Sequence, residues 1–422
     1  MPTFNYTKLF LNIKDDNIVF YDSFEASINN SLSVITNATL DYIPDSCPHC
    51  GTINPKLESK GFQKTSLIKL IKLSNRNAYL NLKKKRFICL ECNRSFTLSS
   101  NLIDKHCSIS NPLKHSVALN LANATSMKLI ATNHNISFNS VTRVLYTFND
   151  NLNKSNMINY LPDSLLFDEF KSVKNISGKM SFIFLDASNH NIVDIVENRQ
   201  LHYLEKYFNR YTQQARDNVK SIVIDMYVPY IQLIKKVFKN ATIIFDKFHI
   251  IQHINRALNK ARITLMNKDK INYNKLKRYW RLLLTNRNKI DNCKYKNSRC
   301  FNKMMTDLQI VDYLINLDDE FKESYYYYQA FIKAIEYKDR DKLNYLLNNI
   351  SDNISPILRK ALNSMIKHKE YILNCLDNKL TNGAIEGTNN KIKLLKRVSY
   401  GFRSFTNFKL RIMLHFNLIK KV

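Results

Sequence analysis

The order of strands and helices between residues 163 and 262 constrains the fold of this chain more than any other feature of its sequence. Apolar runs of strand length alternate there with stretches of helical periodicity. The predicted strands are 164–170, 180–186, 192–197, 221–225 and 241–246, and the predicted helices are 201–216, 229–238 and 250–262. Turn-like residues separate the first three strands, which favours a meander. The predicted order is therefore βββαβαβα, an α/β fold with one mixed five-stranded sheet.

This order matches the ribonuclease H-like fold, in which the first strand lies between the second and the fourth. Asp168 lies on the first predicted strand and Asp225 ends the fourth, so we expect their carboxylates to be close enough to share divalent cations. Two Mg²⁺ or Mn²⁺ ions about 4 Å apart activate the attacking oxygen and stabilise the leaving oxygen of a phosphoryl displacement. Taken alone, each aspartate is also an ordinary strand-end turn residue, and only the strand order favours the pair.

A third carboxylate is expected from Glu386, in a segment that starts with turn residues and continues with helical periodicity. Spacings of four, seven and eleven place Asn390, Lys393 and Arg397 on the same helical face as Glu386. The face would combine a metal ligand with groups that bind DNA phosphates. The alternative is an ordinary glutamate in the first turn of a helix, where the helix dipole favours it.

Asp246 also ends a predicted strand, the fifth, and spacing alone does not choose between it and Asp225. The fold places the fifth strand one position further from the first, about 5 Å more. We therefore expect Asp246 to lie beside the metal ligands, where it orients His249 or contacts DNA. The alternative is that Asp246 caps the helix that begins near residue 250.

Two Cys-x-x-Cys pairs predict a zinc ribbon, because each pair can turn both thiolates toward one tetrahedral ion. The expected ligands of this structural Zn²⁺ are Cys47, Cys50, Cys89 and Cys92. The 38 residues between the pairs exceed the usual ribbon spacing, but they contain predicted hairpin strands at 66–73 and 78–82. Two unrelated pairs of buried cysteines are the alternative. His49, His106 and Cys107 are not expected to be ligands, and the basic run 83–86 is expected to meet phosphates.

Residues 126–145 have the pattern of a helix-turn-helix, with Ser137 as the N-cap of the second helix. Leu129, Ile130 and Ala131 are expected to pack the first helix, and Val141, Val144 and Leu145 the second. The side chains expected to face the major groove of DNA are Asn139, Ser140, Thr142 and Arg143. A short three-helix cap without DNA contact would give the same pattern.

The charge of the chain favours a nucleic-acid partner. Lys and Arg number 64 against 35 Asp and Glu, giving a net charge of +29. Part of this lysine content fits the coding bias of an AT-rich genome. No stretch reaches the roughly 18 to 20 apolar residues of a membrane span, so no membrane contact and a cytoplasmic, nucleoid-associated location are expected. The six glycines form no phosphate-binding loop, which argues against a nucleotide-driven motor.

Segments 167–170, 224–230, 245–249 and 386–402 resemble, in this order, motifs of bacterial insertion-sequence transposases of the ISL-three group. That family joins a zinc-binding domain and a helix-turn-helix to a DDE transposase core. By this resemblance Asp168, Asp225 and Glu386 correspond to its acidic metal-binding triad, and residues 246–249 resemble its Cys/Asp-x-x-His element. The resemblance implies binding to the terminal inverted repeats of an element and metal-dependent cleavage and transfer of strands into target DNA. A homodimer or higher oligomer on DNA is expected.

The expected domains are an N-terminal segment (1–45), a zinc ribbon (46–108), a helix-turn-helix (109–158), a catalytic domain (159–262 and 381–422) and a helical insertion (263–380). Within the insertion, the basic and aromatic residues 275–281 could stack on a flipped base. The tail 400–415 is expected to form a packed helix with basic residues toward DNA. Two other functions fit the same features: a transcription regulator without catalysis, and a structure-specific nuclease that cuts without rejoining.

Overall fold

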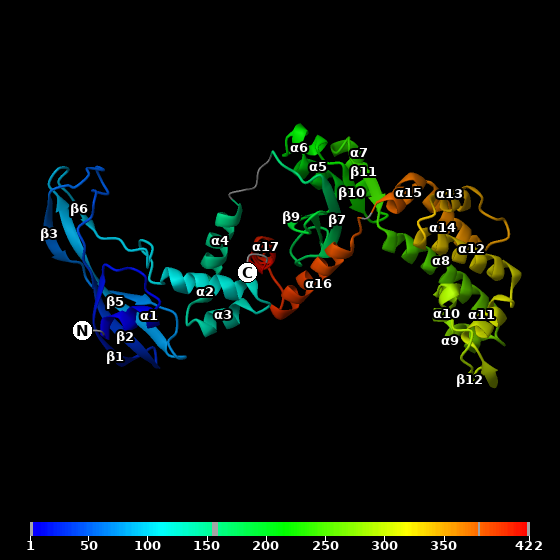
Figure 1. Ribbon diagram of the computed structural model, residues 1–422, viewed down its shortest axis with the longest axis horizontal. Helices are drawn as coiled ribbons and strands as arrows, with labels where there is room; N and C mark the ends of the chain where they lie inside the picture. Colours follow the sequence, from blue (N-terminus) through cyan, green and yellow to red (C-terminus); the bar gives the residue numbers. More distant parts are fainter. Residues whose placement is uncertain (1–2, 154–158, 379, 420–422) are drawn as a thin grey trace. The chain divides into compact units, whose positions relative to one another are not determined.

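The computed structural model describes residues 3–153, 159–378 and 380–419 (Figure 1). The chain forms two compact units. Unit 1 contains residues 1–156 and 392–422, and unit 2 contains residues 157–391. The boundary that the sequence predicts at residue 158 lies outside the described residues. No helix in the described part of the chain is long and apolar enough to cross a membrane.

Unit 1 begins with a six-stranded sheet organised around one long strand, β5. The elements are α1 (Thr3–Phe10), β1 (Ile18–Ile28), β2 (Ser31–Leu40), β3 (Leu57–Phe62), β4 (Ser66–Lys69), β5 (Asn77–Cys89) and β6 (Arg94–Thr97). Strand β5 pairs parallel with β2 and antiparallel with β3, β4 and β6. The predicted hairpin is present as β4 and β5, with Ser66 opposite Leu82.

The N-terminal residues are part of this sheet, although the sequence suggested a separate segment over 1–45. Strands β1 and β2 form an antiparallel hairpin, and β2 joins the ribbon through its parallel pairing with β5. The apolar side chains of both parts share one core, in which Ile18, Leu40, Leu80 and Leu82 are almost fully buried. Burial of this shared apolar face explains why the segment is not independent.

Unit 1 continues with a helical domain made of α2 (Asn111–Ala122), α3 (Met127–Asn133), α4 (Phe138–Asn153) and α17 (Phe405–Ile419). The helix-turn-helix prediction matches α3 and α4. Ser137 Oγ accepts a hydrogen bond from the Ser140 backbone N–H at 3.1 Å, which is the expected N-cap of α4. Val141, Val144 and Leu145 are buried as expected, but Leu129 is 49% exposed and does not pack α3.

The C-terminal helix corrects the expected catalytic segment 381–422. Helix α16 (Gly383–Val398) begins in unit 2, whereas residues from 392 onward belong to unit 1. The physical reason is apolar packing, because Leu410 and Leu414 of α17 join the core of α2 and α4. Arg411 is also fully buried rather than directed to DNA. Its Nη2 donates to the backbone oxygens of Asn123 and Thr125, at 2.8 and 2.7 Å, and so ties α17 to the loop between α2 and α3.

Unit 2 contains a five-stranded sheet with the order β11–β10–β7–β8–β9. The strands are β7 (Ser164–Lys171), β8 (Met180–Asp186), β9 (Ile192–Val196), β10 (Ser221–Ile224) and β11 (Thr242–Phe245). The central strand β7 is antiparallel to β8 and parallel to β10, and β10 is parallel to β11. The prediction that the first strand lies between the second and the fourth is confirmed.

Helices follow the strands as the sequence predicts, with one difference. The helices are α5 (Leu201–Phe208), α6 (Gln213–Asp217), α7 (Val228–Val237) and α8 (Lys247–Lys268). The single helix expected over 201–216 is divided, because Thr212 caps a new helix by accepting a hydrogen bond from the Ala215 N–H at 3.3 Å. Phe167 of β7 stacks on Phe208 of α5 and meets Phe238 after α7, which joins the helices to the sheet.

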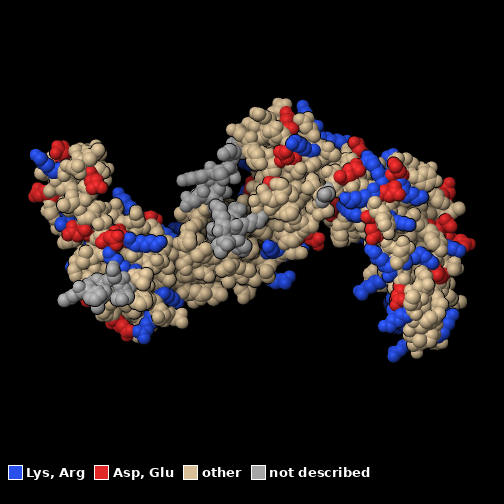
Figure 2. All heavy atoms as spheres, viewed as in Figure 1, with Lys and Arg blue, Asp and Glu red and all other residues tan. Residues whose placement is uncertain are grey.

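The helical region that follows includes α9 (Tyr273–Arg278), α10 (Trp280–Leu284), α11 (Asp307–Ile315), α12 (Asp319–Glu336), α13 (Arg340–Asn348), α14 (Pro356–Ile366), α15 (Lys369–Asp377) and the hairpin β12–β13 (Lys296–Ser298 and Lys303–Met305). It is continuous with the core through α8. Asn374 of α15 also donates to the Ile243 oxygen of β11 at 2.9 Å. Tyr325 and Tyr328 of α12 are buried core residues. On the face seen in Figure 2, basic and acidic side chains are intermixed over this region.

Candidate active site

Asp168 and Asp225 come from neighbouring strands of unit 2. The parallel pairing of β7 with β10 sets Leu166 opposite Val223. Asp168 and Asp225 each lie two residues after this pair. Asp168 Oδ2 accepts a hydrogen bond from Asn389 Nδ2 at 2.7 Å, and its Oδ1 accepts one from the Glu169 N–H at 2.7 Å. Asp225 Oδ1 lies 3.0 Å from His249 Nε2. The strand order has thus brought together two carboxylates that are 57 positions apart in the sequence.

The two aspartates have unusual proton affinities because both are largely removed from water. Burial raises the pKa of Asp168 to about 7, and the negative charges of Asp225 and Glu169 add to this rise. Burial and the charge of Asp246 likewise raise the pKa of Asp225 to about 7. A pair of this kind needs a positive counter-charge to be fully ionised at neutral pH, and a bound divalent cation supplies one. The donor set therefore fits oxygen-preferring cations.

Two buried asparagines of the α16 segment hold these carboxylates. Asn389 is 6% exposed and Asn382 is 5% exposed. Besides the bond from Asn389 to Asp168, Asn382 Nδ2 makes a long hydrogen bond of 3.4 Å to Asp225 Oδ1. The Oδ1 atoms of both asparagines are buried without a hydrogen-bond partner among the described residues. These asparagines were not found by sequence reasoning, although their spacing around Glu386 could have indicated them.

Glu386 lies between the two asparagines on one helical face. It is four residues after Asn382 and three before Asn389, and these spacings share a face of a helix. The side chain of Glu386 is exposed. In the described part of the chain, it does not join Asp168 and Asp225 in a group of three close ligand atoms. The structure therefore brings the predicted pair together and presents the helical face of Glu386 to it, without closing the triad.

Asp246 and His249 lie beside Asp225. Asp246 follows β11, is 4% exposed, and accepts a hydrogen bond from the Asn382 N–H at 3.3 Å. His249 Nε2 lies 3.9 Å from Asp246 Oδ2. Asp246 occupies the N-cap position of α8, but its side chain makes no capping hydrogen bond, so the expected alternative of a capping side chain is wrong. Ligand atoms of Asp225, Asp246 and His249 all lie within 4.8 Å of one another.

Glu169 is a further acidic residue of the site that the sequence reasoning missed. Its carboxylate forms an ion pair with Arg199 and accepts a hydrogen bond of 2.7 Å from the Tyr230 hydroxyl. The Arg199 guanidinium also lies over the Tyr227 ring, 5.1 Å from its centroid. Because both carboxylate oxygens of Glu169 already have a partner, Glu169 is not a free metal ligand. Its position directly after Asp168 was the available signal.

The four predicted zinc ligands form a second cluster, in unit 1. Cys47 Sγ lies 3.8 Å from Cys92 Sγ, and Cys50 Sγ lies 3.9 Å from Cys89 Sγ. Thiolates bound tetrahedrally at about 2.3 Å from a zinc ion would lie about 3.8 Å apart, so the spacing fits Zn²⁺. Hydrogen bonds with Thr52 lower the pKa of Cys50 to about 6, which favours the thiolate form. Among the described residues this cluster contains only the four cysteines, and His49, His106 and Cys107 are outside it.

The basic run next to the second knuckle is only partly available to phosphates. Residues 83–86 lie on β5, so successive side chains point to opposite faces of the sheet. Lys85 Nζ pairs with Asp41 at 2.9 Å, and burial lowers the pKa of the half-buried Lys84. The expectation that the whole run meets DNA is therefore too broad.

The predicted DNA contacts differ in their exposure. Asn139 and Arg143 of α4 are exposed and Thr142 is half-buried. Ser140 is only 9% exposed, and its hydroxyl bonds to Ser137 Oγ at 2.9 Å, so it belongs to the cap of α4 and does not face outward. The predicted phosphate-binding side chains on α16 are all exposed, namely Asn390, Lys393 and Arg397.

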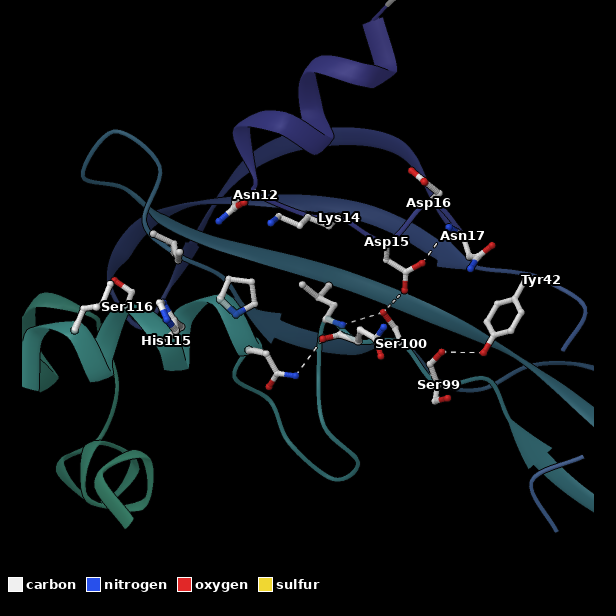
Figure 3. A pocket seen from close by; sticks show the side chains of 16 residues that line it. Asn12, Lys14, Asp15, Asp16, Asn17, Tyr42, Ser99, Ser100, His115 and Ser116 are labelled. Carbon is white, nitrogen blue, oxygen red and sulfur yellow. Dashed lines mark hydrogen bonds between the residues drawn. The ribbon is translucent and has the colours of Figure 1, made fainter. Parts of the chain in front are cut away.

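A pocket of about 1080 Å³ lies in unit 1, and none of the predicted metal ligands lines it (Figure 3). Asp15, Ser100 and Tyr42 line it, with the start of α2. Ser100 donates to Asp15, and the Tyr42 hydroxyl donates to the Ser99 oxygen at 3.0 Å. These hydrogen bonds hold the loops around the pocket, which contains none of the predicted ligands.

Comparisons with known proteins match two parts of the chain. A family model described as "Transposase", of the ISL3 group of DDE transposases, matches residues 165–412. A second, described as "zinc-finger of transposase IS204/IS1001/IS1096/IS1165", matches residues 43–92. The chain is similar to the transposase for insertion sequence element IS1001 of Bordetella parapertussis, with 24% identity over 258 residues, 59% of each chain.

Another relative is named "ATP-dependent protease", from Lactococcus lactis subsp. lactis. The two are 39% identical over 113 residues, which is 26% of this chain and 35% of the relative. The chain thus spans between about one third and three fifths of the length of these two curated relatives. The family model covers more than half of this chain, and its range contains both aspartates and Glu386. The chain belongs to the ISL3 group of DDE transposases and carries the zinc ribbon of that group.

Proposed function

We propose that this protein binds the terminal inverted repeats of an insertion sequence and catalyses metal-dependent cleavage and transfer of DNA strands. The observation that carries the proposal is the pairing of Asp168 with Asp225 on adjacent parallel strands, with Glu386 between Asn382, which contacts Asp225, and Asn389, which contacts Asp168. Membership of a transposase family supports the same chemistry.

Asp168, Asp225 and Glu386 would hold two Mg²⁺ or Mn²⁺ ions. When bound, such ions supply the charge that stabilises the attacking and leaving oxygens of an in-line displacement at phosphorus. Asn389 fixes the orientation of the Asp168 carboxylate, and His249 is placed to hold that of Asp225. Glu386, whose carboxylate is exposed, would complete the set. No covalent intermediate with the protein is required.

DNA recognition would use the helix-turn-helix of unit 1 together with α16. Helix α4 presents Asn139, Thr142 and Arg143 as the side chains for base edges in the major groove. Asn390, Lys393 and Arg397 of α16 would bind phosphates near the cleaved strand. The zinc ribbon of 46–108 and the helix-turn-helix of 109–158 would act together on the element ends. The helical region 263–380 would contribute to assembly of a homodimer or higher oligomer on target and element DNA.

The test compares Asp168→Asn with the wild type on DNA that carries the ends of the element. The amide keeps the shape of the side chain and removes the charge that holds the cation, so cleavage should be lost while binding to the ends persists. Asp163→Asn is the matched control, because Asp163 is an exposed aspartate that pairs with Lys220 near the start of the same strand. Undiminished cleavage by Asp168→Asn would contradict the assignment.

The competing functions give different outcomes in the same experiment. A transcription regulator would bind the ends and cut nothing, and a structure-specific nuclease would cut without joining the 3′ end to a second DNA. A strand-transfer assay with labelled ends separates these cases.

A further inference from the structure

Asp225 is in contact with possible metal ligands besides Asp168. Asp225 lies between two groups of side chains: Asp168 on one side, and Asp246 with His249 on the other. We propose that Asp225, Asp246, His249 and the amide oxygen of Asn382 form a divalent-cation site of their own, with Asp225 shared between this site and the ion held with Asp168. The inference rests on the proposed function only for the ion that Asp225 holds together with Asp168.

The distances between the ligand atoms fit a six-coordinate ion. An Mg²⁺ ion with ligands at about 2.1 Å sets neighbouring ligand atoms about 3 Å apart and opposite ones about 4.2 Å apart. His249 Nε2 lies 3.0 Å from Asp225 Oδ1 and 3.9 Å from Asp246 Oδ2. The whole group of ligand atoms lies within 4.8 Å. Small side-chain adjustments are therefore enough to place all three on one cation.

Asn382 is a buried amide beside these carboxylates that has an oxygen unpartnered among the described residues. Its backbone N–H donates to Asp246 Oδ1 at 3.3 Å and its Nδ2 makes the long bond to Asp225 Oδ1, so it contacts both carboxylates. Its Oδ1 is nevertheless buried without a partner in the described structure. A buried amide oxygen of this kind calls for a donor or a cation. Rotation of the amide by half a turn would exchange the two long bonds of Nδ2, each 3.4 Å, to Phe167 O and Asp225 Oδ1 for an oxygen that faces a cation bound to Asp225.

The mixed ligand set indicates which cation the site prefers. Mg²⁺ is bound by oxygen ligands almost alone, whereas imidazole nitrogen favours transition metals. One nitrogen and three oxygens therefore favour Mn²⁺ over Mg²⁺. Asp246 and His249 would then contact the ion directly, and the bond between His249 and Asp225 would be replaced by shared coordination.

The experiment counts Mn²⁺ ions on the zinc-loaded full chain without DNA, by equilibrium titration with electron paramagnetic resonance of free Mn²⁺. The wild type should bind two ions, and both Asp246→Asn and Asp168→Asn should bind one. In the wild type, pulsed resonance should detect nitrogen coupling to Mn²⁺, and His249→Ala should lose it. Circular dichroism of each variant verifies that unit 2 remains folded. His253→Ala, one turn further along α8, should keep both ions and the nitrogen coupling.

The outcomes separate the inference from the proposed function. Two ions in Asp246→Asn, or nitrogen coupling that survives His249→Ala, would overturn the inference alone. A single wild-type ion that is lost in Asp168→Asn and kept in Asp246→Asn would also overturn it and leave the proposed function intact. The reverse pattern would support the new site and contradict the role of Asp168. A wild type without any bound Mn²⁺ would overturn both.

Discussion

The zinc cluster and the carboxylate site differ in how far apart in the sequence their ligand residues lie. Each zinc ligand pair comes from a knuckle of four residues, and the strand β5 leads directly into the second knuckle. The carboxylate site instead draws on β7, β10, the start of α8 and α16, and the bond from Asn389 to Asp168 joins residues 221 positions apart. A structural metal site can thus be encoded by local spacing, whereas this candidate catalytic site depends on the whole topology of unit 2.

The largest expected effect tests whether the two sites are independent. Cys89→Ser removes one of four thiolates, so the content of tightly bound zinc should fall from about one ion per chain to near zero. Binding to the element ends should weaken, because the sheet that carries the ribbon loses its metal cross-link. Elemental analysis after purification without chelators measures the zinc.

Unit 2 provides the internal control for this variant. The Mn²⁺ affinity of the carboxylate site should stay unchanged in Cys89→Ser, since its ligands belong to another compact unit. Cys375→Ser is a control for the loss of a thiol, because Cys375 lies in α15 outside the cluster. Loss of Mn²⁺ binding in Cys89→Ser would show that the two sites do not fold separately.

The next effect concerns the asparagine that holds Asp168. Asn389→Ala removes the hydrogen bond to Asp168 Oδ2 and leaves the carboxylate free to rotate. Loss of a group that orients a metal ligand costs about 10- to 100-fold in metal affinity, so Mn²⁺ binding and cleavage should both weaken by about that factor. Asn374→Ala is the matched control, since the Asn374 side chain donates to the backbone oxygen of Ile243 in β11 and not to a carboxylate. Equal losses in both variants would indicate a general effect on packing.

The sequence predicts the parts of unit 2 that depend on apolar periodicity. The strand order, and with it the pairing of Asp168 with Asp225, follows from five apolar runs and the helices between them. The contacts of Asn382 and Asn389 have no such signal, because an amide on a helix has many available partners until the tertiary fold is formed. Ser140 was misplaced for a related reason. Helical periodicity placed it outward, but the N-cap of α4 turns its hydroxyl toward Ser137.

The C-terminal helix shows the same limit at the level of domains. Its apolar positions predict that it packs, but not on which surface. Leu414 packs in the core beside α2, and the buried Arg411 donates to loop carbonyls next to α2. These contacts assign α17 to unit 1. The four cysteines needed no such information, since their spacing alone specified the partners.

A smaller effect is expected from pH, through the raised pKa values of Asp168 and Asp225. An unfolded aspartate has a pKa of about 3.9, whereas both side chains have a pKa of about 7 in the folded protein. Between these values the folded state binds more protons than the unfolded state, so the free energy of unfolding falls as pH rises from about 4 to 7. Without added divalent ions, the Tm of unit 2 should therefore fall over this range.

Mn²⁺ should reverse this dependence, because it competes with protons for the same oxygens. Its stabilisation should be small at pH 5 and should grow toward pH 8. Calorimetry with and without Mn²⁺ measures the dependence of Tm on pH in both conditions. Asp168→Asn should weaken the dependence that is measured without metal. A metal-free Tm that rises between pH 5 and 7 by an amount dependent on Asp168 would contradict the raised pKa.

The smallest expected effect is at the DNA-reading helix, where unit 1 allows a neighbouring pair to be compared. Arg143 is exposed on α4, whereas Ser140, three residues earlier, is buried in the cap. Loss of one arginine contact to a base costs about 1 to 3 kcal/mol and relaxes sequence preference. Arg143→Ala should therefore reduce the preference for element ends over random duplex about tenfold, with a smaller change in affinity for random DNA. Ser140→Ala should lower the stability of the helical domain and leave the preference unchanged.

Fluorescence anisotropy at several salt concentrations separates base contacts from phosphate contacts, since contacts to phosphates weaken with salt for every sequence. If Arg143→Ala instead weakens binding to all duplexes equally, α4 contacts only the DNA backbone and sequence is read elsewhere in the chain.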